Sequence, residues 1–203
     1  MKKNLTLLIL LITLQSCIGA GQNSKIAEDE VAKTTITKTS RIKNLPPKSI
    51  IGESFPTLTG IDLQGNQRQL PQSFDGKLNL VIVAFKREQQ VEVDSWIKTF
   101  AEISAKNPQI NFYEVPLIYE LSAPSRWWIN NGMRQGVKSE AARSRTITVY
   151  TDRAKFFNIT KMKAEKIYAL LIDKSGKILW QSEGSSTPEN TKSLQNFLKL
   201  YKK

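Results

Sequence analysis

Side chains able to do chemistry are scarce in this 203-residue chain, which has one cysteine, Cys17, and no histidine. A thiol can act as a nucleophile, a metal ligand or a site of covalent modification. The lack of histidine excludes catalytic triads, imidazole acid–base pairs and histidine-containing metal sites. The carboxylates show no spacing typical of a metal site or an acid–base pair, and there is no phosphate-binding loop. The chemistry open to the chain therefore depends on the position of Cys17.

Cys17 follows a segment that has the features of a bacterial secretory signal. Two lysines precede an apolar run over residues 5–14, which has the length of a signal-peptide core and is too short to span a bilayer. Leu14 at minus three and Ser16 at minus one match the lipobox of bacterial lipoproteins, in which the cysteine is acylated and becomes the new N-terminus. The sequence therefore predicts a lipoprotein signal peptide over residues 1–16 and an acyl chain, such as palmitate, on Cys17.

An ordinary signal peptide cut near Ala20-Gly21 is the alternative, and it would discard Cys17. In either case the folded part keeps no free thiol, which excludes cysteine-based activity there. Both versions predict export. The lipoprotein version places the mature chain in the bacterial cell envelope, anchored to membrane lipid on the extracytoplasmic side.

Residues 17–48 are polar and lack periodic apolar positions, which is typical of a flexible tether. A random coil of this length spans roughly 30 Å. The formal net charge of the chain is +12, and removal of the two signal lysines leaves +10. A basic surface beside a bilayer attracts anionic headgroups or acidic protein partners, whereas an exported protein is not expected to bind nucleic acid.

Beyond residue 48, strand and helix periodicities predict an α/β domain over residues 49–203. The run over residues 78–85 is apolar on both faces, as expected of a central strand. The following helix should bury Val93, Trp96 and Phe100, because these residues lie three or four positions apart. The other predicted elements are two short strands flanking Gly65-Asn66, strands over 110–118, 146–150, 168–172 and 177–181, and helices over 125–142, around 156–159 and from Thr187-Pro188 onward.

This order of elements predicts a mixed sheet with helices on both faces. It resembles the thioredoxin fold in its redoxin-type form, with an N-terminal strand pair added. The part that carries the resemblance runs from Gly52 to Phe85 and includes Phe55-Pro56, Asp62-Leu63, Gly65, Leu70, Phe74 and Gly76-Lys77.

The redox site of that fold is missing from this sequence. Redoxins place a reactive cysteine where the helix after the central strand begins, because the helix N-terminus favours the thiolate. The corresponding positions here are Gln90 and Val93. Redoxins also place a cis-proline before the hairpin strand, at a position close to Ile167. A cis bond without proline costs roughly 3–4 kcal/mol, so we expect a trans bond and a redox-inert binding scaffold with no cofactor or metal.

Two sequence segments in the C-terminal half point to one family within the thioredoxin-like superfamily. One spans residues 143–159, and the other contains Tyr168-x-Leu-Leu-x-Asp173 followed by Gly176-Lys177-Ile178-x-Trp180. Together with Asp94-Ser95-Trp96 they resemble the assembly factors that help mitochondria build the membrane sector of ATP synthase, which are redoxin-like and lack the redox cysteines. The resemblance covers roughly residues 80–200. The present chain departs from it by carrying a lipoprotein signal in place of a mitochondrial presequence.

The resemblance implies an assembly or chaperone-like role with a membrane-protein client. The alternative is an enzyme, either a redoxin relative with a non-cysteine activity or a domain that receives a thiol from a partner. The lack of any thiol, imidazole or ligand cluster favours the binding role.

Candidate partner-binding residues lie between residues 126 and 166, where ten Lys or Arg and three acids give a net charge of +7. Trp127 and Trp128 are adjacent, so on a helix they point about 100° apart and cannot both face the core. Arg143 and Arg145 are predicted to alternate along a strand and to face the same side. These four residues define a predicted basic interaction surface, and the alternative is an ordinary solvated face.

Overall fold

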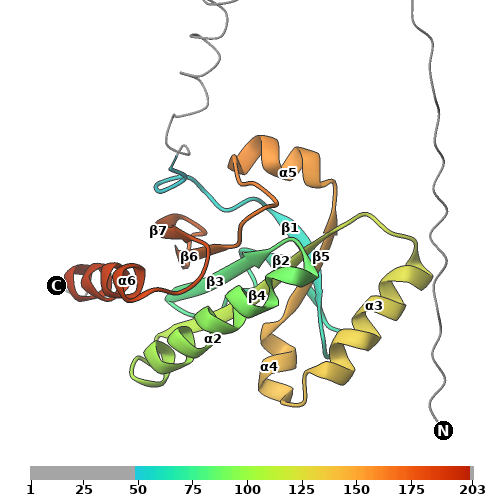
Figure 1. Cartoon of the computed structure of the whole chain (residues 1–203), viewed down its shortest axis with the longest axis horizontal. Coiled ribbons are helices and arrows are strands. Elements are labelled where there is room, and N and C mark those ends of the chain that lie inside the picture. The colour runs from blue at the N-terminus through green and yellow to red at the C-terminus, as the bar shows by residue number, and fades with distance from the viewer. Residues whose placement is uncertain (1–48, 202–203) are drawn as a thin grey trace, which may run out of the picture. The chain divides into compact units, whose positions relative to one another are not determined.

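A seven-stranded sheet organises residues 49–201, which are the residues that the computed structural model describes (Figure 1). The strands lie in the order β2-β1-β5-β4-β3-β6-β7. The predicted signal peptide over residues 1–16, Cys17 and the predicted tether over residues 17–48 lie outside the described residues. These boundaries stay predictions.

The strands lie close to their predicted positions and form a mixed sheet. β3 is parallel to β4 and β4 is parallel to β5, while all other neighbouring pairs are antiparallel. This confirms the predicted thioredoxin-like arrangement. The strands are β1 (Leu58–Asp62), β2 (Gln67–Leu70), β3 (Leu78–Ala84), β4 (Ile110–Tyr119), β5 (Ile147–Thr151), β6 (Tyr168–Asp173) and β7 (Ile178–Glu183).

Every residue of β3 is buried, as its apolar sequence predicts, because helices cover both faces of the sheet. α2 (Gln90–Ala105) and α6 (Pro188–Tyr201) pack on one face, where Leu80 meets Trp96 and Leu194. α5 (Arg153–Thr160) and the segment that leads into β1 cover the other face, around Val81 and Phe156.

Trp96 and Trp180 are core residues on the α2–α6 face, and both satisfy their indole N–H groups there. Trp96 Nε1 donates to the Gly184 carbonyl at 2.7 Å, and Trp180 Nε1 donates to Ser193 Oγ at 3.1 Å. The two rings lie 5.9 Å apart between centroids. Both indoles therefore tie a helix to the β6–β7 hairpin or to the loop that follows it.

The predicted helix over residues 125–142 is wrong in its extent, because the structure has two helices there. α3 (Ala123–Gly136) ends at Gly136, and Val137 is extended. α4 (Glu140–Arg145) then begins behind Ser139, whose side chain accepts a hydrogen bond from the Ala142 N–H. Ser139 is a favourable N-cap, which restarts the helix at that point.

The predicted strand alternation of Arg143 and Arg145 is also wrong. Both residues belong to α4, and β5 begins only at Ile147. The physical reason is the N-cap at Ser139, which starts a short helix over Glu140–Arg145. Both arginines are therefore helical, and the chain becomes extended only after them.

The β1–β2 turn is built around Asp62, whose side chain is fully buried. Its carboxylate accepts hydrogen bonds from the backbone N–H groups of Gln64 and Asn66 and from Nε of Arg68 at 2.9 Å. Burial pushes the pKa of Asp62 upward, but the bonds from Asn66 and Arg68 outweigh it and hold the pKa below its ordinary value. Asp62 thus stabilises the N-terminal strand pair.

The first described residues run along the free edge of β7. The Gly52 N–H donates to the Ile178 carbonyl at 2.8 Å, the Ile178 N–H donates to the Glu53 carbonyl at 2.9 Å, and the Phe55 N–H donates to the Gly176 carbonyl at 2.8 Å. The entry of the chain into the domain is therefore fixed to the last strand of the sheet.

Candidate functional site

The loop after β3 occupies the position where a redoxin would carry its cysteines. A short 3-10 turn, η1 (Arg87–Gln89), leads directly into α2. Gln89 is buried, and its Oε1 accepts hydrogen bonds from the backbone N–H groups of Phe85 at 2.8 Å and Lys86 at 3.0 Å. Its Nε2 donates to the Ala164 carbonyl at 2.9 Å. One amide side chain therefore joins the end of β3 to the segment that precedes β6.

The two positions that correspond to redox cysteines differ in their surroundings. Gln90 is exposed and donates to Asp94 Oδ1, one helical turn along α2, at 2.9 Å. Val93 is buried in the core between α2 and the sheet. The bond before Ile167 is trans, as predicted, since the one cis bond among the described residues is Leu70-Pro71. This loop holds a bonded amide and a packed aliphatic side chain in place of a dithiol.

α3 is the most exposed helix element beside the sheet. None of its residues is buried. The side chains of Trp127 and Trp128 are 68% and 74% exposed. The sequence predicts exposure of one of the two, and both are exposed. The side of α3 that faces the sheet is attached by polar contacts, so neither indole is needed there.

The contacts that hold α3 on the sheet are hydrogen bonds. Tyr150 of β5 donates through its hydroxyl to Asn130 Oδ1 at 2.8 Å. Arg134 Nε donates to the Leu63 carbonyl at 2.6 Å, and Thr148 contacts the sulfur of Met133 at 3.9 Å. Partial burial raises the pKa of the Tyr150 hydroxyl above its ordinary value, so it stays a donor. The tryptophans take no part in this attachment.

The predicted basic surface is used in large part by contacts inside the domain. Arg143 Nε donates to the Val137 carbonyl at 2.7 Å, and the guanidinium of Arg145 lies 4.2 Å from the ring centroid of Phe112. Burial lowers the pKa of Arg145. No hydrogen bond or ring contact among residues 49–201 joins either arginine to the tryptophan pair. The structure therefore separates the four candidate residues onto two helices.

Arg153 is a buried cation that the sequence did not single out. It is only 5% exposed, and its guanidinium carbon lies 4.2, 5.3 and 5.5 Å from the ring centroids of Tyr119, Phe157 and Phe85. Its Nε has no hydrogen-bond partner, and no carboxylate among the described residues pairs with it. Rings from β4, α5 and the end of β3 surround it, which no local sequence pattern could reveal.

Glu114 is a second residue that the sequence analysis missed, although one acid inside an apolar strand is a readable signal. It lies on β4, partly buried, and accepts a hydrogen bond from Thr146 Oγ1 at 3.4 Å. Burial raises the pKa of this carboxyl to about 7, with a smaller contribution from the charge of Asp94. Glu114 therefore titrates near neutral pH.

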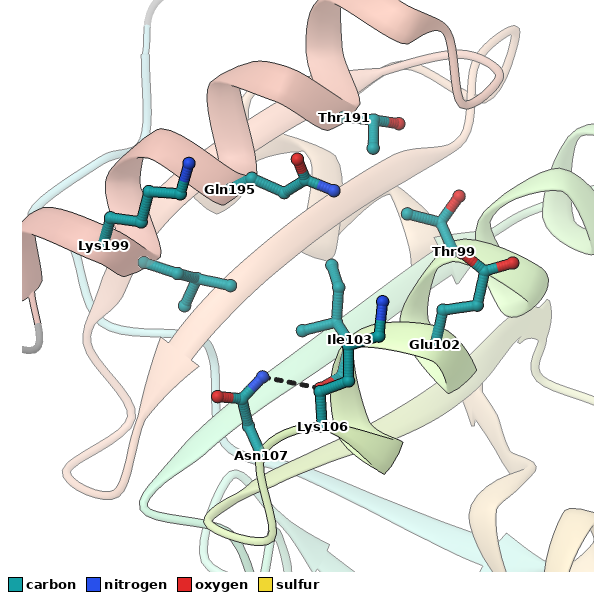
Figure 2. A pocket seen from close by; sticks show the side chains of 9 residues that line it. Thr99, Glu102, Ile103, Lys106, Asn107, Thr191, Gln195 and Lys199 are labelled. Carbon is teal, nitrogen blue, oxygen red and sulfur yellow. Dashed lines mark hydrogen bonds between the residues drawn. The ribbon is translucent and has the colours of Figure 1, made fainter.

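A groove of about 310 Å³ lies between α2 and α6. Figure 2 shows Thr191, Gln195 and Lys199 on the α6 wall and Thr99 and Glu102 on the α2 wall. Its lining contains one carboxylate, two lysines and no thiol or imidazole.

Two features are absent from the described residues. Residues 49–201 contain no group of three or more acidic, cysteine or histidine side chains placed to bind a metal ion. Within the same residues, no helix has both the length and the apolar character needed to cross a bilayer.

Solved structures with the same fold include two whose TM-scores reach 0.50. One is the thioredoxin domain of a thiol-disulfide oxidoreductase from Bacteroides vulgatus, with 20% identity, 74% of this chain and 99% of that chain covered. The other is yeast Sco1, with 11% identity and coverages of 73% and 96%. At these identities the likeness shows the thioredoxin-like fold alone.

Two sequence comparisons complete the picture. No curated protein sequence matches the chain. A profile of the ATP10 protein family matches residues 33–200, which is most of the chain.

Proposed function

The chain belongs to the ATP10 protein family, and we propose on that basis that it assists the assembly of an ATP synthase at a bacterial membrane. The observation that carries the proposal is the match over residues 33–200, which includes almost the whole described domain. In this role the thioredoxin-like domain binds a membrane-protein client and does not act on a substrate.

The expected phenotype tests this role directly. Deletion of the gene should lower the amount of assembled ATP synthase on native gels, while the amounts of its separate subunits change less. The full chain should restore assembly, and a client subunit should co-purify with it from solubilised membranes. Normal assembly in the deletion strain would contradict the proposal.

Redox inactivity is the second part of the proposal, and it is supported by the residues at the cysteine positions. Gln90 is bonded to Asp94 and Val93 is packed in the core, so neither supplies a nucleophile. The purified chain should not reduce insulin disulfides or consume hydrogen peroxide above background, with a thioredoxin as positive control. Sustained turnover in either assay would favour the alternative, an enzyme with a non-cysteine activity or a borrowed thiol.

Lipid anchoring is the third part, and it is supported by the lipobox at Cys17. The mature N-terminus should carry acyl chains by mass spectrometry, and Cys17→Ser should release the protein from membranes or block its processing. An unmodified N-terminus at Gly21 would contradict it.

A further inference from the structure

The segment that contains α3 has an unusual distribution of charge. Residues 121–139 contain three cations, Arg126, Arg134 and Lys138, and no acid. All three are exposed. Arg126 Nε donates to the Leu121 carbonyl just before the helix, and Arg134 Nε donates to the Leu63 carbonyl, so both side chains are held in place. The surface of α3 and of the loop that follows it therefore carries positive charge and no negative charge.

Trp127 and Trp128 lie on the same helix and are largely exposed. Neither indole takes part in a hydrogen bond or a ring contact within residues 49–201. Exposed patches of large aromatic side chains often mark surfaces that contact a partner or a membrane. The two indoles therefore suit an environment that is apolar around the ring and leaves the N–H hydrogen-bonded to water or another polar group.

We propose that α3 is a membrane-docking element whose tryptophans enter the headgroup region of an anionic bilayer while Arg126, Arg134 and Lys138 contact lipid phosphates. Amphipathic helices with tryptophan and basic residues bind in this way, and tryptophan is enriched at membrane interfaces. The inference rests on the membrane location proposed above. It adds a second contact through the folded domain, which would fix the orientation of that domain on the bilayer.

The surroundings of the indoles favour a lipid surface over a protein partner. A protein hot spot lies among apolar contacts that exclude water and pairs with a pocket. The helical neighbours of Trp128 are instead Asn131, Gly132 and Gln135. The groove between α2 and α6 and the smaller one near Ser54 are both lined by other elements. An exposed helix surface on which small polar residues surround the indoles, with no pocket beside them, fits the headgroup region of a bilayer better than a protein partner.

The intrinsic fluorescence of the chain gives a direct test. Trp96 and Trp180 are buried in the core, so quenching by lipids reports Trp127 and Trp128. The full acylated chain is reconstituted into phosphatidylcholine vesicles with or without 30% phosphatidylglycerol, with acyl chains brominated near the headgroup. We expect quenching and a blue shift with the anionic vesicles at low salt, and loss of both as salt screens the charges.

A pair of charge variants makes the test specific for α3. Lys138→Glu reverses an exposed cation next to α3, and Lys192→Glu makes the same change on α6. α6 packs beside β7, whereas α3 is attached to β5 and to the β1–β2 turn, toward the other end of the strand order (Figure 1). Each cation near an anionic surface contributes a factor of about five, so Lys138→Glu should lower the docking equilibrium roughly thirtyfold. Lys192→Glu should behave as the wild type.

The outcomes separate docking from anchoring. Floated protein with unquenched emission in anionic vesicles overturns the docking proposal and leaves the anchor intact. Equal effects of the two variants, or quenching that ignores salt and lipid charge, also overturn it. Protein that floats with neither vesicle overturns docking and anchoring together. If the emission stays unquenched in anionic vesicles and Trp127→Ala/Trp128→Ala loses a membrane protein that co-purifies with the wild type, α3 binds a protein client instead.

Discussion

Glu114 is a partly buried carboxyl whose pKa in the folded state lies near neutral pH. Burial raises its pKa to about 7 from an ordinary value near 4.5, so the folded state binds this proton more tightly than the unfolded state. The stability that this provides is fully present below pH 4.5 and is lost as pH rises through 7, with a magnitude of up to about 3 kcal/mol.

Glu114→Gln should remove this loss, because a neutral amide keeps the shape of the protonated acid. We expect the variant to unfold at higher denaturant than the wild type at pH 8.5, and at nearly the same denaturant at pH 5. Glu102→Gln on the exposed face of α2 is the control and should change stability by less than about 0.5 kcal/mol at either pH. Identical pH profiles for wild type and Glu114→Gln would refute the assignment.

Arg153 is a buried charge whose partners are aromatic rings. A buried cation without a counterion carries a desolvation penalty, while its stem packs like an aliphatic chain. Arg153→Met should therefore keep the packing and leave the free energy of unfolding unchanged or higher by about 1 kcal/mol. Arg153→Ala should lower it by about 2 kcal/mol through lost contacts. If the methionine variant is as unstable as the alanine variant, the cation–π contacts stabilise the fold more than burial of the charge opposes it.

At the scale of elements, adjacent glutamines in the loop after β3 have opposite roles. Gln89→Ala would leave the Phe85 and Lys86 N–H groups and the Ala164 carbonyl without their partner, and we expect a loss of about 2 kcal/mol or more. Gln90→Ala removes one exposed bond to Asp94 and should cost less than about 0.5 kcal/mol. Chemical denaturation of both variants compares them, and equal losses would show that Gln89 does not fix this loop.

α3 and α2 should also differ in local stability. α3 has no buried residue, whereas α2 buries Val93, Trp96, Phe100 and Ile103. Helices with few buried apolar contacts open locally at lower free energy. In hydrogen exchange, amides of α3 should therefore exchange at least tenfold faster than those in the middle of α2. Equal protection would show that its polar contacts hold α3 as firmly as a packed helix.

The elements that sequence periodicity predicts well are those that bury a continuous apolar face. The strand over 78–84, the helix that buries Trp96 and the hairpin around Gly176 all lie where expected, since their spacing alone fixes which side is inside. The break between α3 and α4 depends on a cap at Ser139, and the surroundings of Arg153 and Gln89 depend on long-range packing. Exposure of both tryptophans likewise depends on tertiary structure, because the side of α3 that faces the sheet is attached by polar contacts.

At the scale of the whole molecule, β3 makes the two cores one unit. Leu80 faces the core under α2 and α6, and its neighbour Val81 faces the core under α5. Leu80→Ala and Val81→Ala should each lower the free energy of unfolding by about 2–4 kcal/mol, and circular dichroism and Trp fluorescence should report the same midpoint in both variants. Separate transitions would show that the faces unfold independently.

The pairing of the first described residues with β7 has a mechanical consequence. A chain held at its N-terminal end and pulled by a bound client would transmit tension first to Ile50, whose N–H donates to Gln181 Oε1 at 3.1 Å, and then to the hydrogen bonds between residues 52–55 and residues 176–178. These bonds lie at the edge of the sheet, so they can part while every strand of the sheet keeps its neighbours, although Ile50 and Phe55 would then leave the core under α5. Detachment of this junction would lengthen the reach of the domain under load before any strand of the sheet separates from its neighbour.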